Sequence, residues 1–189
     1  MKPGVRARNA ATRSSSSSGN TGQIYAYDLE ARRLAETIRR GDRAGVRNLQ
    51  IRSPVIADPL KDLLGKMDVV FIDAPCSGSG AWRRHPDTKW RLTPELLTKR
   101  MADQDIVLDL GATFVKPGGR LVYVTCSVLP EEDEDRVEAF LARTPSFTVH
   151  PASAEPDLQP HLTPEGYLRL TPANAGTDGF FVAVLEKER

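Results

Sequence analysis

Apolar and polar residues follow two different periods along most of this chain, and together they predict alternating strands and helices. Short apolar runs such as 69–72 and 121–124 are typical of β-strands, and their near-continuous apolar character favours strands buried on both faces of a sheet. The predicted strands are residues 23–27, 48–52, 68–73, 120–125, 147–150 and 180–185, and the predicted helices are 29–44, 94–114 and 131–142. Strands that alternate with helices predict an α/β fold with a doubly wound sheet.

Other stretches of the chain fall outside this alternation. Residues 1–20, with their serine run, show neither period, so we expect a disordered leader there and a folded region over 21–189. The Lys-Pro-Gly-Gly sequence at 116–119 predicts a turn. The acidic run 131–135 follows a proline and is expected to complement the dipole at the N-terminus of a helix.

Composition adds three limits to this picture. The chain has 189 residues, 40% of them hydrophobic, which is enough for one domain with its own core. Residues 1–52 carry 11 basic and 4 acidic side chains, a net charge of +7, whereas the rest of the chain has a net charge of −6. The basic part can bind a polyanion, although charged helix faces are usually only solvated. Two cysteines are too few for a secreted disulfide framework, so we expect a protein of the reducing cytoplasm. No long apolar segment or apolar signal core is present, so we expect no membrane partner, and we expect no metal either.

The chain has only two cysteines, and each follows a predicted apolar strand. Cys76 lies three residues after Asp73, and Cys126 directly follows the strand that ends at residue 125. Ligands of open α/β sheets bind outside the carboxyl ends of the strands, so the two thiols are expected to share one pocket. The alternative is two small buried residues, and a bridge between them is possible. The loop-forming neighbours of Cys76 favour the chemical interpretation.

Carboxylates also follow the strands. Asp28 can accept hydrogen bonds from two ribose hydroxyls or can cap the next helix, and Asp58 is equally ambiguous. Asp73 is the stronger candidate, because an acid that ends a buried strand must reach the crevice or be buried at high cost. Gly78 and Gly80 allow a backbone to approach a ligand closely, although such a segment is often only a flexible turn.

Basic and aromatic residues gather between 82 and 100. Both tryptophans of the chain lie there with a large excess of basic over acidic side chains. Basic groups among large aromatics suit phosphate contacts combined with base stacking. The basic residues are Arg83, Arg84, His85, Lys89, Arg91, Lys99 and Arg100, against Asp87 and Glu95.

These residues resemble the Sun-type (NSUN/RsmB) RNA cytosine-5 methyltransferases. The resemblance lies in Asp-Ala-Pro-Cys-Ser-Gly-Ser-Gly at 73–80 with Trp-Arg-Arg two residues later, and in Val-Thr-Cys-Ser at 124–127. It extends to Gly-Gln-Ile-Tyr-Ala-Tyr-Asp at 22–28, to the Lys-Pro-Gly-Gly turn, and to Gly-Thr-Asp-Gly-Phe-Phe at 176–181. It covers about residues 20–186 and implies a Rossmann-like class I methyltransferase sheet with helices on both faces.

The resemblance implies a role for each thiol. C5 of cytosine is too weak a nucleophile to take a methyl group directly, so a thiolate first adds to C6. By analogy with the family this thiolate is Cys126, and Cys76 assists its release after methyl transfer. Asp73 is implied to lie near both cofactor and base, where it can hydrogen-bond the N3 edge of the cytosine.

The resemblance also implies a cofactor and a partner. The cofactor is S-adenosylmethionine, with Asp28 and Asp58 as contacts to its ribose and adenine. The partner is RNA, most simply ribosomal RNA, with Arg83, Arg84 and Lys89 on its phosphates. The target base has to be unpaired or flipped to reach such a pocket.

The chain departs from the family pattern just before residue 23. The family has a strand and a glycine-rich loop there, in place of which this sequence has residues 8–19 with their serines. The lost strand is central in the family's sheet, between the strands that end at Asp28 and Asp73, so its absence exposes two inner edges. We therefore expect a truncated gene product, or part of a longer enzyme, that binds cofactor poorly.

Two other classes of function stay open at this point. The main alternative is a non-catalytic RNA-binding remnant that keeps the basic and aromatic surface. A small-molecule methyltransferase of the same architecture is the third, but it needs neither the two-cysteine arrangement nor the Trp-Arg-Arg cluster, and it predicts no salt-dependent affinity for RNA.

Overall fold

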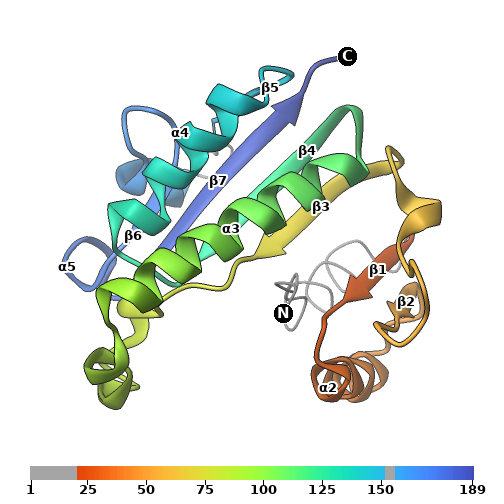
Figure 1. Cartoon of the computed structure of the whole chain (residues 1–189), viewed down its shortest axis with the longest axis horizontal. Coiled ribbons are helices and arrows are strands. Elements are labelled where there is room, and N and C mark those ends of the chain that lie inside the picture. The colour runs from red at the N-terminus through yellow and green to blue at the C-terminus, as the bar shows by residue number, and fades with distance from the viewer. Residues whose placement is uncertain (1–20, 152–155) are drawn as a thin grey trace.

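Two separate β-sheets form within residues 21–151 and 156–189, the part of the chain that the computed structural model describes (Figure 1). The expected leader at 1–20 lies outside the described residues. The smaller sheet pairs β1 (Ile24–Tyr27) in parallel with β2 (Leu49–Arg52). The larger sheet has the order β3 (Met67–Asp73), β4 (Val115–Thr125), β7 (Phe180–Lys187) and β5 (Phe147–Val149), and β6 (Leu168–Leu170) also pairs with β7.

The larger sheet is mixed. β3 and β4 run parallel, whereas β7 is antiparallel to β4, β5 and β6. The α-helices are α2 (Ala31–Arg43), α3 (Pro94–Phe114), α4 (Glu134–Arg143) and the short α5 (Pro172–Ala175). The 3₁₀ segments are η1 (Lys61–Leu63), η2 (Ser79–Ala81), η3 (Pro86–Arg91), η4 (Pro130–Glu132) and η5 (Pro156–His161). The α/β fold class is confirmed.

The longest helix, α3, has the bounds that the sequence predicts. The hydroxyl of Thr93 accepts a hydrogen bond from the backbone N–H of Leu96 at 3.2 Å, and Pro94 occupies the first helical position. α3 and α4 lie along one face of the larger sheet (Figure 1). At Gly111 an added Cβ would come within 2.6 Å of Cδ1 of Ile72, so this glycine allows α3 to lie close against β3.

The two faces of the larger sheet differ in burial. Ile72 and Tyr123, on the face toward α3 and α4, are fully buried. On the opposite face Val69 is 56% exposed and Phe71 is 39% exposed. The expectation that the run 69–72 is buried on both faces is therefore wrong, because the described residues cover only one face of β3.

Several element boundaries also differ from the prediction. The Lys-Pro-Gly-Gly segment is not a turn between elements but lies inside β4, where Gly118 has a φ of +70° and the register against β3 shifts between Met67 and Val69. The helix expected from residue 131 begins at Glu134, after the 3₁₀ turn η4. The strand β6 and the helix α5 were not predicted, because they lie in a proline-rich stretch whose composition predicts a loop.

The smaller sheet stands apart from the larger one. Among the described residues β1 pairs with β2 alone and β3 with β4 alone, so no strand joins the two sheets. This arrangement matches the gap expected between the strands that end near Asp28 and at Asp73. The N–H of Gly65, just before β3, donates to the carbonyl of Thr113 in the last turn of α3 at 2.9 Å, which ties the start of β3 to that helix. No helix in the described part of the chain is long and apolar enough to cross a membrane.

Candidate active site

The two cysteines meet at one edge of the larger sheet. Because β3 and β4 are parallel neighbours, the loops that follow them begin side by side, and Asp73 pairs with Val124 in the register. The Sγ atoms of Cys76 and Cys126 lie 3.4 Å apart, both side chains are half-buried, and both thiols are free. The expectation that the thiols share an edge is confirmed. The hydrogen bond to Cys126 and burial raise the pKa of the Cys76 thiol well above its ordinary value.

Backbone contacts join the two cysteine loops to the start of β7. The N–H of Gly80 donates to the carbonyl of Cys126 at 3.0 Å, and the N–H of Gly179 donates to the carbonyl of Gly80 at 2.8 Å. An added Cβ at Gly80 would lie 2.3 Å from the carbonyl oxygen of Gly179, so only glycine fits there. Gly78 has a φ of +72° and open space around it. Gly80 is thus needed for contact with this chain's own backbone.

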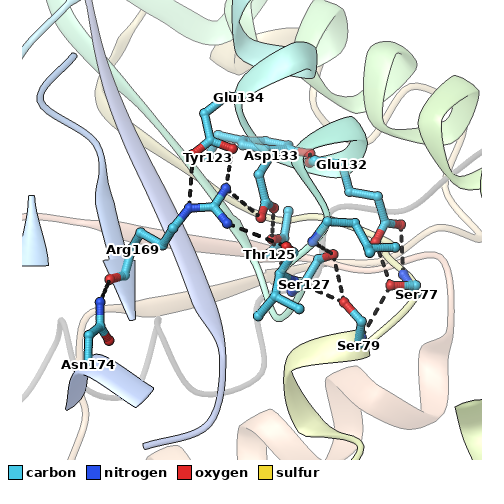
Figure 2. Close-up of polar contacts among 12 residues, drawn as sticks. Ser77, Ser79, Tyr123, Thr125, Ser127, Glu132, Asp133, Glu134, Arg169 and Asn174 are labelled. Carbon is cyan, nitrogen blue, oxygen red and sulfur yellow. Dashed lines mark hydrogen bonds and ion pairs between the residues drawn. The ribbon is translucent and has the colours of Figure 1, made fainter. Parts of the chain in front are cut away.

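Two serines connect the same loops through their side chains (Figure 2). The hydroxyls of Ser79 and Ser127 lie 3.0 Å apart, and the N–H of Val128 donates to Ser79 Oγ at 2.9 Å. Both serines are buried. Backbone and side-chain bonds together fix the position of Cys126 relative to the loop that carries Cys76.

Two acidic residues after β4 are fully buried behind the cysteines, which the sequence did not predict. Glu132 and Asp133 have relative exposures of 0%, whereas Glu134 and Asp135 occupy the first turn of α4 as the dipole argument expects. Burial of two adjacent acids requires partners, and Figure 2 shows them on neighbouring elements. An acidic run is normally a solvated surface, so the sequence carries no signal that would single out these two.

Asp133 is held at the end of β4. The hydroxyl of Thr125, the residue before Cys126, donates to Asp133 Oδ1 at 2.6 Å, and Nη2 of Arg169 lies 3.5 Å from Oδ2. Arg169 also forms an ion pair with Glu134 (Figure 2). Burial raises the pKa of Asp133 to about 7, although the hydrogen bond from Thr125 and the charge of Arg169 oppose the shift.

The two expected cofactor carboxylates lie outside the larger sheet. Asp28 follows β1 and is buried, and its Oδ1 accepts from the N–H of Glu30 at 2.8 Å. Its Oδ2 is buried without a hydrogen bond among the described residues, with Arg33 Nη1 at 3.6 Å. Asp58, after β2, is exposed and has a φ of +49°, which is uncommon for a residue other than glycine.

The expected phosphate-binding residues lie on the segment after the Cys76 loop. Arg83 Nε donates to Asp178 Oδ1 at 2.5 Å, and Arg84 forms an ion pair with the same carboxylate, which is buried. The hydrogen bond from Arg83 lowers the pKa of Asp178. Lys89 Nζ lies 5.9 Å from the ring of Trp82 and 5.6 Å from that of Trp90, and Trp90 is 82% exposed.

Comparison with known proteins places this geometry in a family. A family model described as 16S rRNA methyltransferase RsmB/F matches residues 11–186. The chain belongs to the RsmB/F family. It is 34% identical over 171 residues to the probable ribosomal RNA small subunit methyltransferase B of Synechocystis, and 36% identical over 173 residues to ribosomal RNA small subunit methyltransferase B of Klebsiella pneumoniae.

The match covers most of this chain but a minor part of its RsmB/F relatives. The aligned regions take in 89% and 88% of this chain, and 38% and 37% of the Synechocystis and Klebsiella proteins. Among solved structures, PH0851 superposes with a TM-score of 0.78 at 34% identity, covering 89% of this chain and 38% of that one. NSun6 from Pyrococcus horikoshii with SFG gives a TM-score of 0.79 at 26% identity, covering 94% and 44%. The Rossmann-like methyltransferase fold is thereby confirmed.

A methyltransferase of the RsmB/F family calls for a methyl-donor cofactor, and one feature of this chain fits it directly. Asp28 Oδ2 is a buried acceptor without a hydrogen-bond donor among the described residues, which suits a ribose hydroxyl. Asp58 is exposed on the loop after the neighbouring strand of the same small sheet, where it is free to face a ligand. No group of metal-binding side chains occurs in residues 21–151 and 156–189.

Proposed function

We propose that this chain is the catalytic part of an RNA cytosine-5 methyltransferase that uses S-adenosylmethionine and acts on ribosomal RNA. The observation that carries the proposal is the pair of free thiols at the carboxyl edge of β3 and β4, with 3.4 Å between the Sγ atoms of Cys76 and Cys126. Membership of the RsmB/F family supports ribosomal RNA as the substrate class. Methyl transfer to C5 of a pyrimidine calls for a thiolate that adds to C6, and a second thiol beside it can assist the release.

In the proposed reaction Cys126 is the nucleophile. Its thiolate adds to C6 of cytosine, which places electron density on C5, and C5 takes the methyl group. S-adenosylmethionine, when bound, supplies an electrophilic methyl group on sulfur. As C5 bonds to the methyl carbon, the methyl–sulfur bond breaks and its electron pair stays on the sulfur of the donor. The C5 proton then passes to solvent, the electron pair of the C5–H bond forms the C5–C6 double bond, and the bond from Cys126 to C6 breaks with return of its electron pair to the Cys126 sulfur. Cys76, 3.4 Å from Cys126, is placed to assist this release.

Asp73 is proposed to bind the base. It ends β3 directly beside Val124 of β4, so its carboxyl group starts from the same sheet edge as the thiols. There it can hydrogen-bond the N3 edge of cytosine as charge develops during addition to C6. Asp28 and Asp58 are proposed as the ribose and adenine contacts of the cofactor, on the evidence of the buried Oδ2 of Asp28, which has no hydrogen bond among the described residues.

The segment after the Cys76 loop is proposed to contact RNA. Arg83 and Arg84 keep side-chain exposures of 55% and 61% although both pair with Asp178, so their remaining N–H groups can reach phosphates. Lys89 lies between the rings of Trp82 and Trp90, which combines a cation with an exposed stacking surface.

A methyl-transfer assay tests the proposal. The purified chain is incubated with methyl-labelled S-adenosylmethionine and small-subunit ribosomal RNA, alone and as Cys126→Ala and Cys76→Ala. We expect label in 5-methylcytosine with the unaltered chain and none with Cys126→Ala. Cys76→Ala is expected to leave a covalent protein–RNA product, because release after methylation is impaired. Equal labelling by the Cys126→Ala chain contradicts the proposal.

One observation favours the second candidate, a non-catalytic RNA-binding remnant. The proposed cofactor and base contacts, Asp28 and Asp73, lie on sheets that share no strand pairing among the described residues. A remnant retains RNA in a filter-binding assay, with an affinity that falls as salt rises, but transfers no label. The same preparation therefore distinguishes the two functions.

A further inference from the structure

A buried carboxylate lies directly behind the Cys76 loop. Glu132 is 0% exposed, and its two oxygens accept hydrogen bonds from Ser77, at 2.8 Å from the backbone N–H and at 2.5 Å from the hydroxyl. Figure 2 shows both bonds between η4 and the loop. Ser77 is the residue next to Cys76, so Glu132 fixes the backbone at the thiol. No lysine or arginine of the described residues forms an ion pair with Glu132.

Neighbouring elements hold Glu132 in this position. Nε2 of Gln104, on α3, donates to Glu132 Oε1 at 3.2 Å and to the carbonyl of Pro75 at 2.9 Å. The hydroxyl of Tyr123, on β4, donates to the backbone carbonyl of Glu132 at 2.7 Å. Gln104 and Tyr123 are themselves fully buried. The carboxylate thus has neutral donors only, and α3 and β4 hold it in place.

The charged and titratable groups around Cys76 come from each of these elements. Cys126 faces it from the end of β4, Tyr123 from within β4 and Glu132 from η4, while Asp73 ends β3, three residues before Cys76. The hydrogen bond to Cys126 is the largest cause of the raised pKa of Cys76, and the negative charge of Glu132 acts in the same direction.

We propose that Glu132 is a positioning residue that holds the Cys76 loop and whose buried charge opposes loss of the Cys76 proton, so that attack on the base is left to Cys126. The inference rests on the proposed function for the two cysteine roles. Its geometric basis is the chain of contacts from Glu132 through Ser77 to Cys76, and from Cys76 to Cys126 at 3.4 Å. One buried carboxylate thereby orders the loop that carries one of the two thiols.

The test is the pH profile of alkylation of each thiol in the whole chain, without RNA or cofactor. Iodoacetamide reacts with the thiolate, and trypsin separates the two cysteines, because Cys76 lies in peptide 67–83 and Cys126 in peptide 121–136. In Glu132→Gln the amide keeps an acceptor for the N–H of Ser77 but loses the charge. We expect the Cys76 profile to move to lower pH by about half to one unit, which is roughly 3–10-fold faster alkylation at pH 8.

Glu131→Gln is the matched control, because it removes the same charge from the exposed neighbouring residue. It is expected to leave both profiles in place. An unchanged Cys76 profile in folded Glu132→Gln, or an equal shift in both variants, overturns the inference. A purely structural role of Glu132 moves neither profile selectively.

A second variant covers the case in which Glu132→Gln does not fold. Ser77→Ala removes the hydroxyl donor but keeps the carboxylate, so Cys76 is expected to remain as slow as in the unaltered chain, or slower. Faster alkylation of Cys76 in Ser77→Ala overturns the inference, because it shows that loop order and not charge controls the thiol. The assay measures no methyl transfer, so its failure is distinct from a failure of the proposed function.

Discussion

At the residue scale, the part of the site that differs most from expectation is the buried acidic pair after β4. Glu132 contacts the loop of Cys76, and Asp133 contacts Thr125 just before Cys126. Each cysteine therefore has its own carboxyl group behind it, on consecutive residues of one turn. Because β3 and β4 end together, a single turn is able to order both loops.

Asp133 predicts a pH dependence of stability. Its pKa of about 7 in the folded chain lies above its ordinary value of 3.8, so between these values the folded chain holds a proton that the unfolded chain has lost. The contribution of protonated Asp133 to the free energy of unfolding is fully present below about pH 4 and is lost as pH rises through 7. The free energy of unfolding falls by at most about 1.4 kcal/mol per pH unit in this range. Urea unfolding from pH 5 to 8 is expected to show this fall for the unaltered chain and to lose it in Asp133→Asn. Asp135→Asn, at an exposed position nearby, serves as the control, and an equal slope in both variants contradicts the assignment.

At the element scale, β3 is a strand with one covered and one open face. Ile72 packs against α3 near Gly111, and Phe71, its neighbour in sequence, points to the opposite face. The apolar run alone predicts equal burial of both. The difference arises from which helices lie over the sheet, and a local pattern carries no information about that.

Two alanine substitutions in β3 test this asymmetry. Ile72→Ala removes a fully buried side chain and is expected to lower the free energy of unfolding by about 2–5 kcal/mol. Phe71→Ala removes a side chain that is 39% exposed, and we expect a loss of about 1 kcal/mol or less. Urea denaturation gives both values, provided that the free energy of unfolding depends on urea concentration with the same slope in both variants. A loss for Phe71→Ala as large as that for Ile72→Ala shows that the second face is covered after all.

Sequence reasoning reached elements and site residues whose signals are local. α3 has the predicted bounds because Thr93 and Pro94 form a standard helix start, and the two cysteines meet as expected because each ends a parallel strand. The same reasoning missed the burial of Glu132 and Asp133, since their partners come from α3, β4, β6 and the loop that follows β3. It also missed that Gly80 packs against Gly179, almost a hundred residues away in the chain.

At the scale of the whole molecule, the division into two sheets separates the proposed cofactor contacts. Asp28 belongs to the β1–β2 sheet and Asp73 to the sheet that carries the thiols, and no strand pairing joins them among the described residues. A ligand that contacts both Asp28 and Asp73 has to fix the position of one sheet relative to the other. We therefore expect S-adenosylmethionine to bind this chain weakly, because part of the binding free energy is used to fix the two sheets relative to each other.

Asp28→Asn tests the cofactor contact by isothermal titration of S-adenosylmethionine. The buried Oδ2 of Asp28 is the proposed acceptor for a ribose hydroxyl, so its replacement by an amide nitrogen is expected to weaken binding about tenfold. Asp62→Asn is the matched control, because Asp62 is exposed and pairs at 2.7 Å with Arg52, the last residue of β2 in the same small sheet. Equal affinity of Asp28→Asn and the unaltered chain contradicts the assignment, and tight binding by the unaltered chain contradicts the expected weakness.

The central claim is that Cys126 attacks C6 of an RNA cytosine while Cys76 does not. Its most direct test uses RNA in which cytidine is replaced by 5-fluorocytidine. Fluorine then takes the place of the C5 proton that has to be lost before Cys126 is released, so the covalent product persists. The chain is incubated with this RNA and S-adenosylmethionine, and the crosslinked peptide is identified by mass spectrometry. The account predicts a nucleotide attached to peptide 121–136 at Cys126. Attachment to Cys76 in peptide 67–83, or no covalent product at all, contradicts it.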